Sequence, residues 1–230
     1  MTLKTLPGDP PLDITLRRSA RARRFSLRVS QLDGRVTLSM PLRAPESEAL
    51  DFARDKAAWI RRKLAESPRR QAVAPGGQVP FEGRRQTVLA AAIPAVSVDG
   101  DRLLVPRGGA HAGARVQAFL KLMARQRLQQ ASERHCARLG RRFRRITLRD
   151  TRSRWGSCTA DGALMYSWRL IMAPPEVLDY VAAHEVAHLA EMNHSPAFWA
   201  VVAGLMPGYE PHRHWLRRHG SALHRIDFSG

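Results

Sequence analysis

Two histidines and a glutamate form the most chemically specific group in this sequence. His184 and His188 are four residues apart, and Glu185 directly follows the first of them. Residues four apart lie on one face of a helix, so both imidazoles could bind a single metal ion. Glu185 is offset by one residue, so its carboxylate could reach a water molecule on that metal rather than the metal itself. A zinc hydrolase needs this combination of two neutral nitrogen ligands and a base.

A third histidine, His194, follows the predicted motif helix. Pro174-Pro175 predict the start of that helix, and Asn193 tolerates the conformation that ends one, so we expect it to end near 192–193. Ser195-Pro196 predict the start of a next helix, over 196–206. We expect the turn between the two helices to bring His194 back over the first two histidines. The alternative is a capping or surface histidine. Three histidine ligands would leave one zinc position open for water.

The elements around this group predict an α+β protein. Residues 12–105 are expected to form a β-rich lobe with one helix, and residues 106–230 the part that carries the motif. The lobe contains strand patterns and an amphipathic helix, and the second part a long helix and a β-hairpin before the motif helix. The strands are expected at 13–17, 25–29, 35–40 and within 86–105, the helices at 45–66 and 114–139, and the hairpin over 144–171 with its turn at 159–162.

The net charge of +18 is the most unusual feature of the composition, with 38 Lys and Arg against 20 Asp and Glu in 230 residues. Affinity for nucleic acid through arginine–phosphate contacts is one interpretation. The other is a generally basic, soluble surface in a genome that favours arginine codons. Arginine runs at 17–28 and 138–154 fit either interpretation.

Localisation is expected to be cytoplasmic. The two cysteines, Cys136 and Cys158, are too few for a disulfide framework, which fits a reducing compartment. No apolar run approaches the roughly 20 residues of a membrane span. Residues 1–11 have no apolar signal core and are expected to be disordered.

Three stretches of the sequence resemble one family. They are Arg154-Trp155-Gly156-Ser157-Cys158, then Tyr166 to Pro174, and then Tyr180 to Trp199. Together they resemble the YgjP-like family of predicted zinc metallopeptidases, and the resemblance covers about residues 14–220. That family is similar in turn to the SprT-like and WLM proteases, which act on proteins attached to DNA or bound near it.

The resemblance implies a Zn²⁺ ion on His184, His188 and His194, with Glu185 as the catalytic base. It also implies a zincin-like core, made of an active-site helix and a β-hairpin or small sheet, together with the N-terminal β-rich lobe. Residues 12–228 would then form one family unit. Metzincins share the spacing from the second to the third histidine, but they have a glycine where this sequence has Glu191. The metzincin family is therefore not assigned.

The role of Arg154, Trp155, Gly156 and Ser157 stays open between two interpretations. As an edge strand beside the motif helix, they could pair with an extended peptide substrate, and Gly156 would allow close backbone approach. As a structural hairpin, they would place Trp155 and Cys158 in the core. A direct metal role for Cys158 is not needed when three histidines are present.

The remaining residues with suitable side chains are less specific. His135 and Cys136 are adjacent, so on a helix they point about 100° apart, which favours packing over shared metal binding. A hydrogen bond to the transition-state oxyanion could come from Tyr209 or from one of the late histidines. The sequence does not choose among them; the late histidines are His212, His214 and His219.

Two function classes follow. The first is a hydrolase, a zinc-dependent metallopeptidase with Glu185 as general base, with nucleic-acid-associated proteins as candidate substrates. The second is a nucleic-acid-binding protein with a non-catalytic metal site. Structural zinc usually has four protein ligands, and the sequence offers three, which favours the enzyme. Hydrolysis of a non-peptide amide is not excluded.

Overall fold

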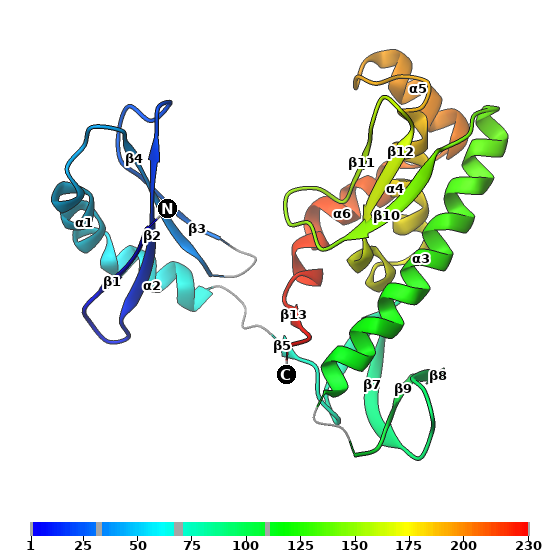
Figure 1. Ribbon diagram of the computed structural model, residues 1–230, viewed down its shortest axis with the longest axis horizontal. Helices are drawn as coiled ribbons and strands as arrows, with labels where there is room; N and C mark the ends of the chain where they lie inside the picture. Colours follow the sequence, from blue (N-terminus) through cyan, green and yellow to red (C-terminus); the bar gives the residue numbers. More distant parts are fainter. Residues whose placement is uncertain (1, 31–33, 67–70, 109–110, 230) are drawn as a thin grey trace. The chain divides into compact units, whose positions relative to one another are not determined.

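The computed structural model describes residues 2–30, 34–66, 71–108 and 111–229. The chain divides into two compact units, residues 1–70 and 71–230 (Figure 1). Each unit has its own buried apolar core. The candidate residues that the sequence identified for metal binding and catalysis all belong to the second unit.

The N-terminal unit is a four-stranded sheet with two helices. The strands are β1 (Thr2–Leu6), β2 (Leu12–Ser19), β3 (Ser26–Val29) and β4 (Val36–Pro41), in the order β1-β2-β4-β3. β2 and β4 are parallel, and the outer pairs are antiparallel. Alternate residues of β2 and β4 are buried, as period-2 patterning requires, and they share a core with α1 (Glu46–Asp55) and α2 (Ala57–Glu66).

Two predictions from the sequence differ from the observed structure of this unit. β1 pairs with β2 along Thr2–Leu6, where we expected a disordered N-terminus, because burial of Leu6 in the core and the pairing itself fix the segment. The single helix expected over 45–66 is two helices that meet at Lys56. The chain turns there, and both Ala53 and Ile60 remain in the same core.

The second unit begins with a sheet of the same strand order. The strands are β6 (Gln78–Phe81), β7 (Arg84–Ala91), β8 (Ser97–Asp99) and β9 (Arg102–Pro106), in the order β6-β7-β9-β8. Again the central pair is parallel and the outer pairs are antiparallel. Two short parallel strands, β5 (Gln71–Ala72) and β13 (Ile226–Asp227), join the two ends of this unit.

The boundary between the units differs from the one expected after residue 105. Helix α3 (Ala112–Leu139) packs against β9, and it also packs against α4 (Pro175–Ala187), the helix of the motif. Val88 and Leu103 of the sheet therefore share one buried core with Val186 of α4. Because of this shared core, the division falls between residues 70 and 71.

A three-stranded sheet precedes the motif helix. It consists of β10 (Arg145–Arg149), β11 (Gly156–Cys158) and β12 (Ala163–Ser167), in the order β10-β12-β11. The turn expected at 159–162 is present and joins β11 to β12. β10 instead lies parallel to β12, because residues 150–155 carry the chain to the other edge before it turns back. β12 ends at Ser167, and a 3₁₀ helix, η1 (Trp168–Met172), follows.

The last three α-helices are α4, α5 (Pro196–Leu205) and α6 (Glu210–Leu223). Pro175 starts α4 and Pro196 starts α5, and the Ser195 hydroxyl accepts a hydrogen bond from the Phe198 amide at 3.4 Å, as predicted for an N-cap. α4 ends at Ala187, earlier than the end expected near 192–193. The amides of Leu189 and Ala190, just after α4, bond three residues back, which tightens the turn. Among the described helices, none is both long and apolar enough to cross a membrane.

Candidate active site

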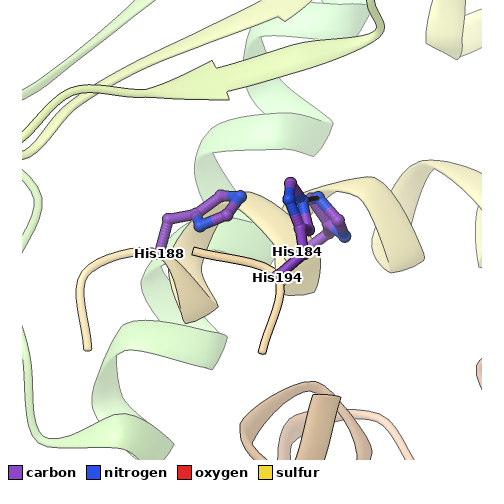
Figure 2. Close-up of side chains that lie close together, drawn as sticks. All are labelled: His184, His188 and His194. Carbon is purple, nitrogen blue, oxygen red and sulfur yellow. Dashed lines mark hydrogen bonds between the residues drawn. The ribbon is translucent and has the colours of Figure 1, made fainter. Parts of the chain in front are cut away.

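Three histidines converge at the end of α4. His184 lies in the last turn of α4, His188 caps its C-terminus, and His194 lies in the short connection to α5 (Figure 2). One ring nitrogen from each lies within 4.8 Å of the others, and the Nε2 atoms of His184 and His194 are 3.1 Å apart. The turn after α4 therefore brings the third histidine back to the first two.

The protonation of His184 and His188 leaves ring lone pairs available. Nδ1 of His188 lies 2.9 Å from the Glu191 carbonyl oxygen, which can only accept, so Nδ1 carries the proton and Nε2 is free. Burial lowers the pKa of His184 to about 3, and burial also lowers the pKa of His188. Imidazole nitrogens that converge in this way fit a divalent metal ion such as zinc.

Phe198 fixes the arrangement of the rings. This fully buried side chain comes from the first turn of α5. Its ring centroid lies 4.9, 4.4 and 4.8 Å from those of the three histidines, in sequence order. Phe198 was not predicted from the sequence to have a role, although it is part of the pattern that carries the family resemblance. Its position three residues after the N-cap of α5 was the available signal.

Glu185 points to a different neighbour, strand β11. Its side chain is 5% exposed, and burial raises its pKa to about 8, while the positive charge of Arg154 acts in the opposite direction. A Cβ atom on Gly156 would lie 2.7 Å from the carboxyl carbon of Glu185. The absence of a side chain at Gly156 therefore makes room for this carboxyl group.

A cleft of about 410 Å³ brings these groups together. Its walls include Glu185, the three histidines and all four residues that the sequence proposed for substrate contact, Arg154, Trp155, Gly156 and Ser157. Cys158 also lines it, and burial raises the pKa of this thiol to about 11. The remaining walls come from α4, from the connection to α5, and from α6; they are Tyr180, Val181, Met192 and Leu216.

Strand β11 has one edge that pairs with no strand among the described residues. It is the outer strand of its sheet, and the Trp155 carbonyl accepts a hydrogen bond from the Ser167 amide of β12 at 2.8 Å. In an antiparallel ladder, residues whose backbone N–H and C=O groups bond to the neighbouring strand alternate with residues whose backbone groups point away from it. Gly156 and Cys158 occupy the alternate positions, so their N–H and C=O groups face the free edge.

Other candidates from the sequence lie elsewhere. The late histidines at 212, 214 and 219 do not line the cleft, and neither does Tyr209. Tyr209 instead stacks on Tyr180, with ring centroids 5.9 Å apart. Tyr180 lines the cleft and lies one helical turn before His184, so it is the tyrosine next to the site. His135 and Cys136 are buried in α3, as the packing interpretation predicted.

A comparison with models of protein families agrees with the resemblance seen in the sequence. The family model described as the YgjP-like metallopeptidase domain matches residues 23–219. A search of curated proteins finds no significant match. Among solved structures, the crystal structure of the metallopeptidase zymogen of Pyrococcus abyssi abylysin aligns with 22% identity and a TM-score of 0.37. That alignment covers 43% of this chain and 97% of the other.

Proposed function

Because this chain belongs to the YgjP-like metallopeptidase family and is a metal-dependent peptidase, we propose that zinc is its metal and Glu185 its general base. The observation that carries this proposal is the single cleft that contains both three converging histidine nitrogens and a buried carboxyl group. His184, His188 and His194 would hold the ion. Zinc, when bound, supplies a Lewis acid that acidifies water and polarises the scissile carbonyl.

Glu185 is suited to move the proton. Burial raises its pKa to about 8, so the carboxylate accepts a proton from the attacking water more readily than an ordinary glutamate does. The same burial stabilises the protonated acid until the proton passes to the leaving amine. Phe198 restricts the three imidazole rings, which keeps the reacting groups in a fixed relation.

The free edge of β11 is the proposed substrate platform. The outward N–H and C=O groups of Gly156 and Cys158 could bond an extended peptide as an added strand. Trp155 and Ser157 alternate with them along the same wall. In this arrangement α4 and the β10-β12-β11 sheet serve as the zincin-like core, with β11 and α4 on the two sides of the bound peptide.

The decisive test is Glu185→Gln in the metal-loaded protein. The amide keeps the shape but cannot take a proton, so cleavage of an unfolded protein should fall by about 10² to 10⁴-fold with unchanged zinc content. His194→Ala is the companion variant and should lose zinc. Wild-type cleavage by zinc-replete Glu185→Gln would reject the proposed base, and unchanged zinc affinity in His194→Ala would reject the third ligand.

We also propose a second activity, contact with nucleic acid through the N-terminal sheet. The residues of β2 and β4 that alternate with the buried ones, among them Arg17 and Ser39, lie on the other face of that sheet. The register aligns Thr15, Thr37 and Arg28 in one row, and Arg17, Ser39 and Ser26 in the next. Arginine and hydroxyl groups both donate to phosphate oxygens. This face would let a peptidase find nucleic-acid-associated proteins.

The alternative is a nucleic-acid-binding protein with a non-catalytic metal site. Such a site would need no buried base beside the metal, yet Glu185 lies in the cleft with a raised pKa. The proposal therefore combines the two activities in one chain.

Both cysteines are free, which suits a reducing compartment such as the cytoplasm.

A further inference from the structure

Arg154 is the cationic side chain of the cleft. Among the described residues that line it, Arg154 is the one arginine or lysine and Glu185 the one acid. The Arg154 side chain is exposed, and its guanidinium makes no hydrogen bond or ion pair with the described part of the chain. By contrast, Arg144 pairs with Asp161 and Arg169 with Asp150. Arg154 is thus free to bind a group that enters the cleft.

Its place along the edge strand determines which part of a substrate it would meet. Gly156 lies against Glu185, and Arg154 lies two residues before it, just outside β11. A peptide added antiparallel to β11 runs opposite to that strand. Its residues on the C-terminal side of the scissile bond would then lie toward Arg154.

We propose that Arg154 selects substrates with a carboxylate on the C-terminal side of the scissile bond. This inference rests on the proposed peptidase function and names its substrate class. The carboxylate can belong to an aspartate or glutamate side chain or to the free C-terminus of a short peptide. A guanidinium is suited to either source because its two parallel N–H groups match the two carboxylate oxygens.

The surroundings of Arg154 favour such a contact. Trp155, Leu216 and Val181 provide apolar walls in the same cleft. Trp155 is held in place: it packs against Gly220 of α6, where a Cβ would lie 2.9 Å from its ring, and against His224, with ring centroids 4.9 Å apart. A substrate that covers these walls would exclude water near Arg154 and strengthen its attraction to a carboxylate.

Arg154 also affects Glu185, and the test must separate the two roles. Its positive charge acts to lower the pKa of Glu185, so any loss of Arg154 changes the rate on every substrate. A ratio between two matched substrates measured on one enzyme cancels that common effect. The charge preference is therefore read from the ratio of kcat/KM values and not from a single rate.

The experiment uses the full-length, zinc-loaded protein and peptides that differ at one position. One pair carries Glu or Gln after the scissile bond, and a second pair ends in a free carboxylate or an amide. Wild type should prefer the acidic member of at least one pair by about fivefold, and that pair identifies the source of the carboxylate. In Arg154→Gln the ratio should fall to about one. Arg154→Lys should keep the preference, and Arg154→Glu should prefer a Lys peptide.

Controls separate failure of this inference from failure of the proposed function. Arg149→Gln removes an exposed arginine of β10 that does not line the cleft, and it should leave both ratios unchanged. Equal ratios in wild type and Arg154→Gln, or an acidic preference only on the N-terminal side, would overturn the role of Arg154. Cleavage of neither pair by zinc-loaded wild type would instead reject the peptidase function itself.

Discussion

Gly156 leaves the space that the carboxyl group of Glu185 occupies. A methyl group there would meet the side chain at 2.6 Å from Cγ and 2.7 Å from Cδ, well inside contact distance. The carboxyl group is buried and cannot simply swing into solvent. Gly156→Ala should therefore move Glu185 or β11 by a large fraction of an ångström, which lowers kcat/KM about 100-fold.

A matched glycine separates this effect from a general response to the added methyl group. Gly204, in α5, has open space where its Cβ would be, so Gly204→Ala should keep full activity and gain slightly in stability. Zinc content should be unchanged in both variants. Wild-type activity in a folded Gly156→Ala protein would show that the position of Glu185 does not depend on this glycine.

At the scale of single residues, the sequence predicted which residues belong to the site better than it predicted which residues they contact. His184 and His188 share a helix turn, so their spacing was enough to place them together. The position of His194 depends on a tight turn, and the tightness of that turn depends on how α5 packs. Ser195 and Pro196, at the start of α5, were the sequence signal for this turn. The contact between Gly156 and Glu185 joins two elements 29 positions apart, and no local pattern encodes such a pair.

The motif helix is attached to α3 by a partly buried polar contact. Asp179 of α4 lies 2.9 Å from Nε2 of His135 and 2.9 Å from the guanidinium of Arg134. Burial acts to raise the pKa of Asp179, but the hydrogen bond from His135 and the charges of His135 and Arg134 together hold the pKa below its usual value. The ionised form of Asp179 therefore stabilises the packing of α3 on α4.

The sign of this pKa shift gives a prediction for stability. A carboxyl group whose pKa is lower in the folded state stabilises the protein above its unfolded pKa of about 4, and this contribution is lost as the pH falls through the folded pKa. Asp179→Asn should cost about 1–3 kcal/mol of unfolding free energy at pH 7. The difference from wild type should shrink below about pH 4. Urea unfolding at both pH values measures it, with exposed Asp99→Asn as the control; a pH-independent difference would contradict the ionic explanation.

A buried arginine holds the C-terminal segment. Arg169, in η1, binds both carboxylate oxygens of Asp150 at 2.6 and 3.0 Å. Its remaining donors reach the carbonyl oxygens of Leu223 at 2.8 Å and Ile226 at 3.0 Å. One side chain thus connects the loop after β10, the end of α6 and strand β13.

Arg169→Met should destabilise the protein by about 3–5 kcal/mol, because it leaves Asp150 and two carbonyl groups without their donors. The loss of unfolding free energy in Arg169→Lys should lie between zero and that of Arg169→Met, since an ammonium group cannot replace the bidentate contact. The free energy of unfolding in urea measures both. Arg149→Met, at an exposed position on β10, provides the control, and equal losses in the two methionine variants would show that the buried network contributes little.

At the scale of elements, local periodicity and turn residues predicted most helices and several strands. The helix expected over 114–139 is present as Ala112–Leu139, and the helix expected over 196–206 as Pro196–Leu205. The parallel pairing of β10 with β12 was missed, because register between distant strands depends on the loop that connects them. The same limit concealed the shared strand order of the two four-stranded sheets, although in each sheet a proline ends the last strand along the chain.

Across the whole molecule, the positive charge is shared by both units. Residues 1–70 carry 16 Lys and Arg against 8 Asp and Glu, and residues 71–230 carry 22 against 12. Total charge therefore does not identify a binding surface, and the arrangement of side chains must. On the N-terminal sheet, the outward face carries Arg17 and Arg28 with hydroxyl residues between them. Its acidic residue, Asp13, accepts a hydrogen bond from Thr5 at 2.7 Å.

This arrangement predicts that Arg17 and Arg28 contact phosphates of a nucleic-acid duplex. Replacing both with Gln should weaken binding of duplex DNA roughly tenfold and lower the slope of log affinity against log salt by up to about 2, since each lost phosphate contact removes about one counterion. The control removes the same charge from the two helices with Arg54→Gln and Arg62→Gln. Fluorescence anisotropy between 50 and 200 mM salt measures both, while kcat/KM on a short peptide should stay constant. An unchanged slope in the sheet variant, or no binding by wild type at the lowest salt, would contradict a nucleic-acid role for this face.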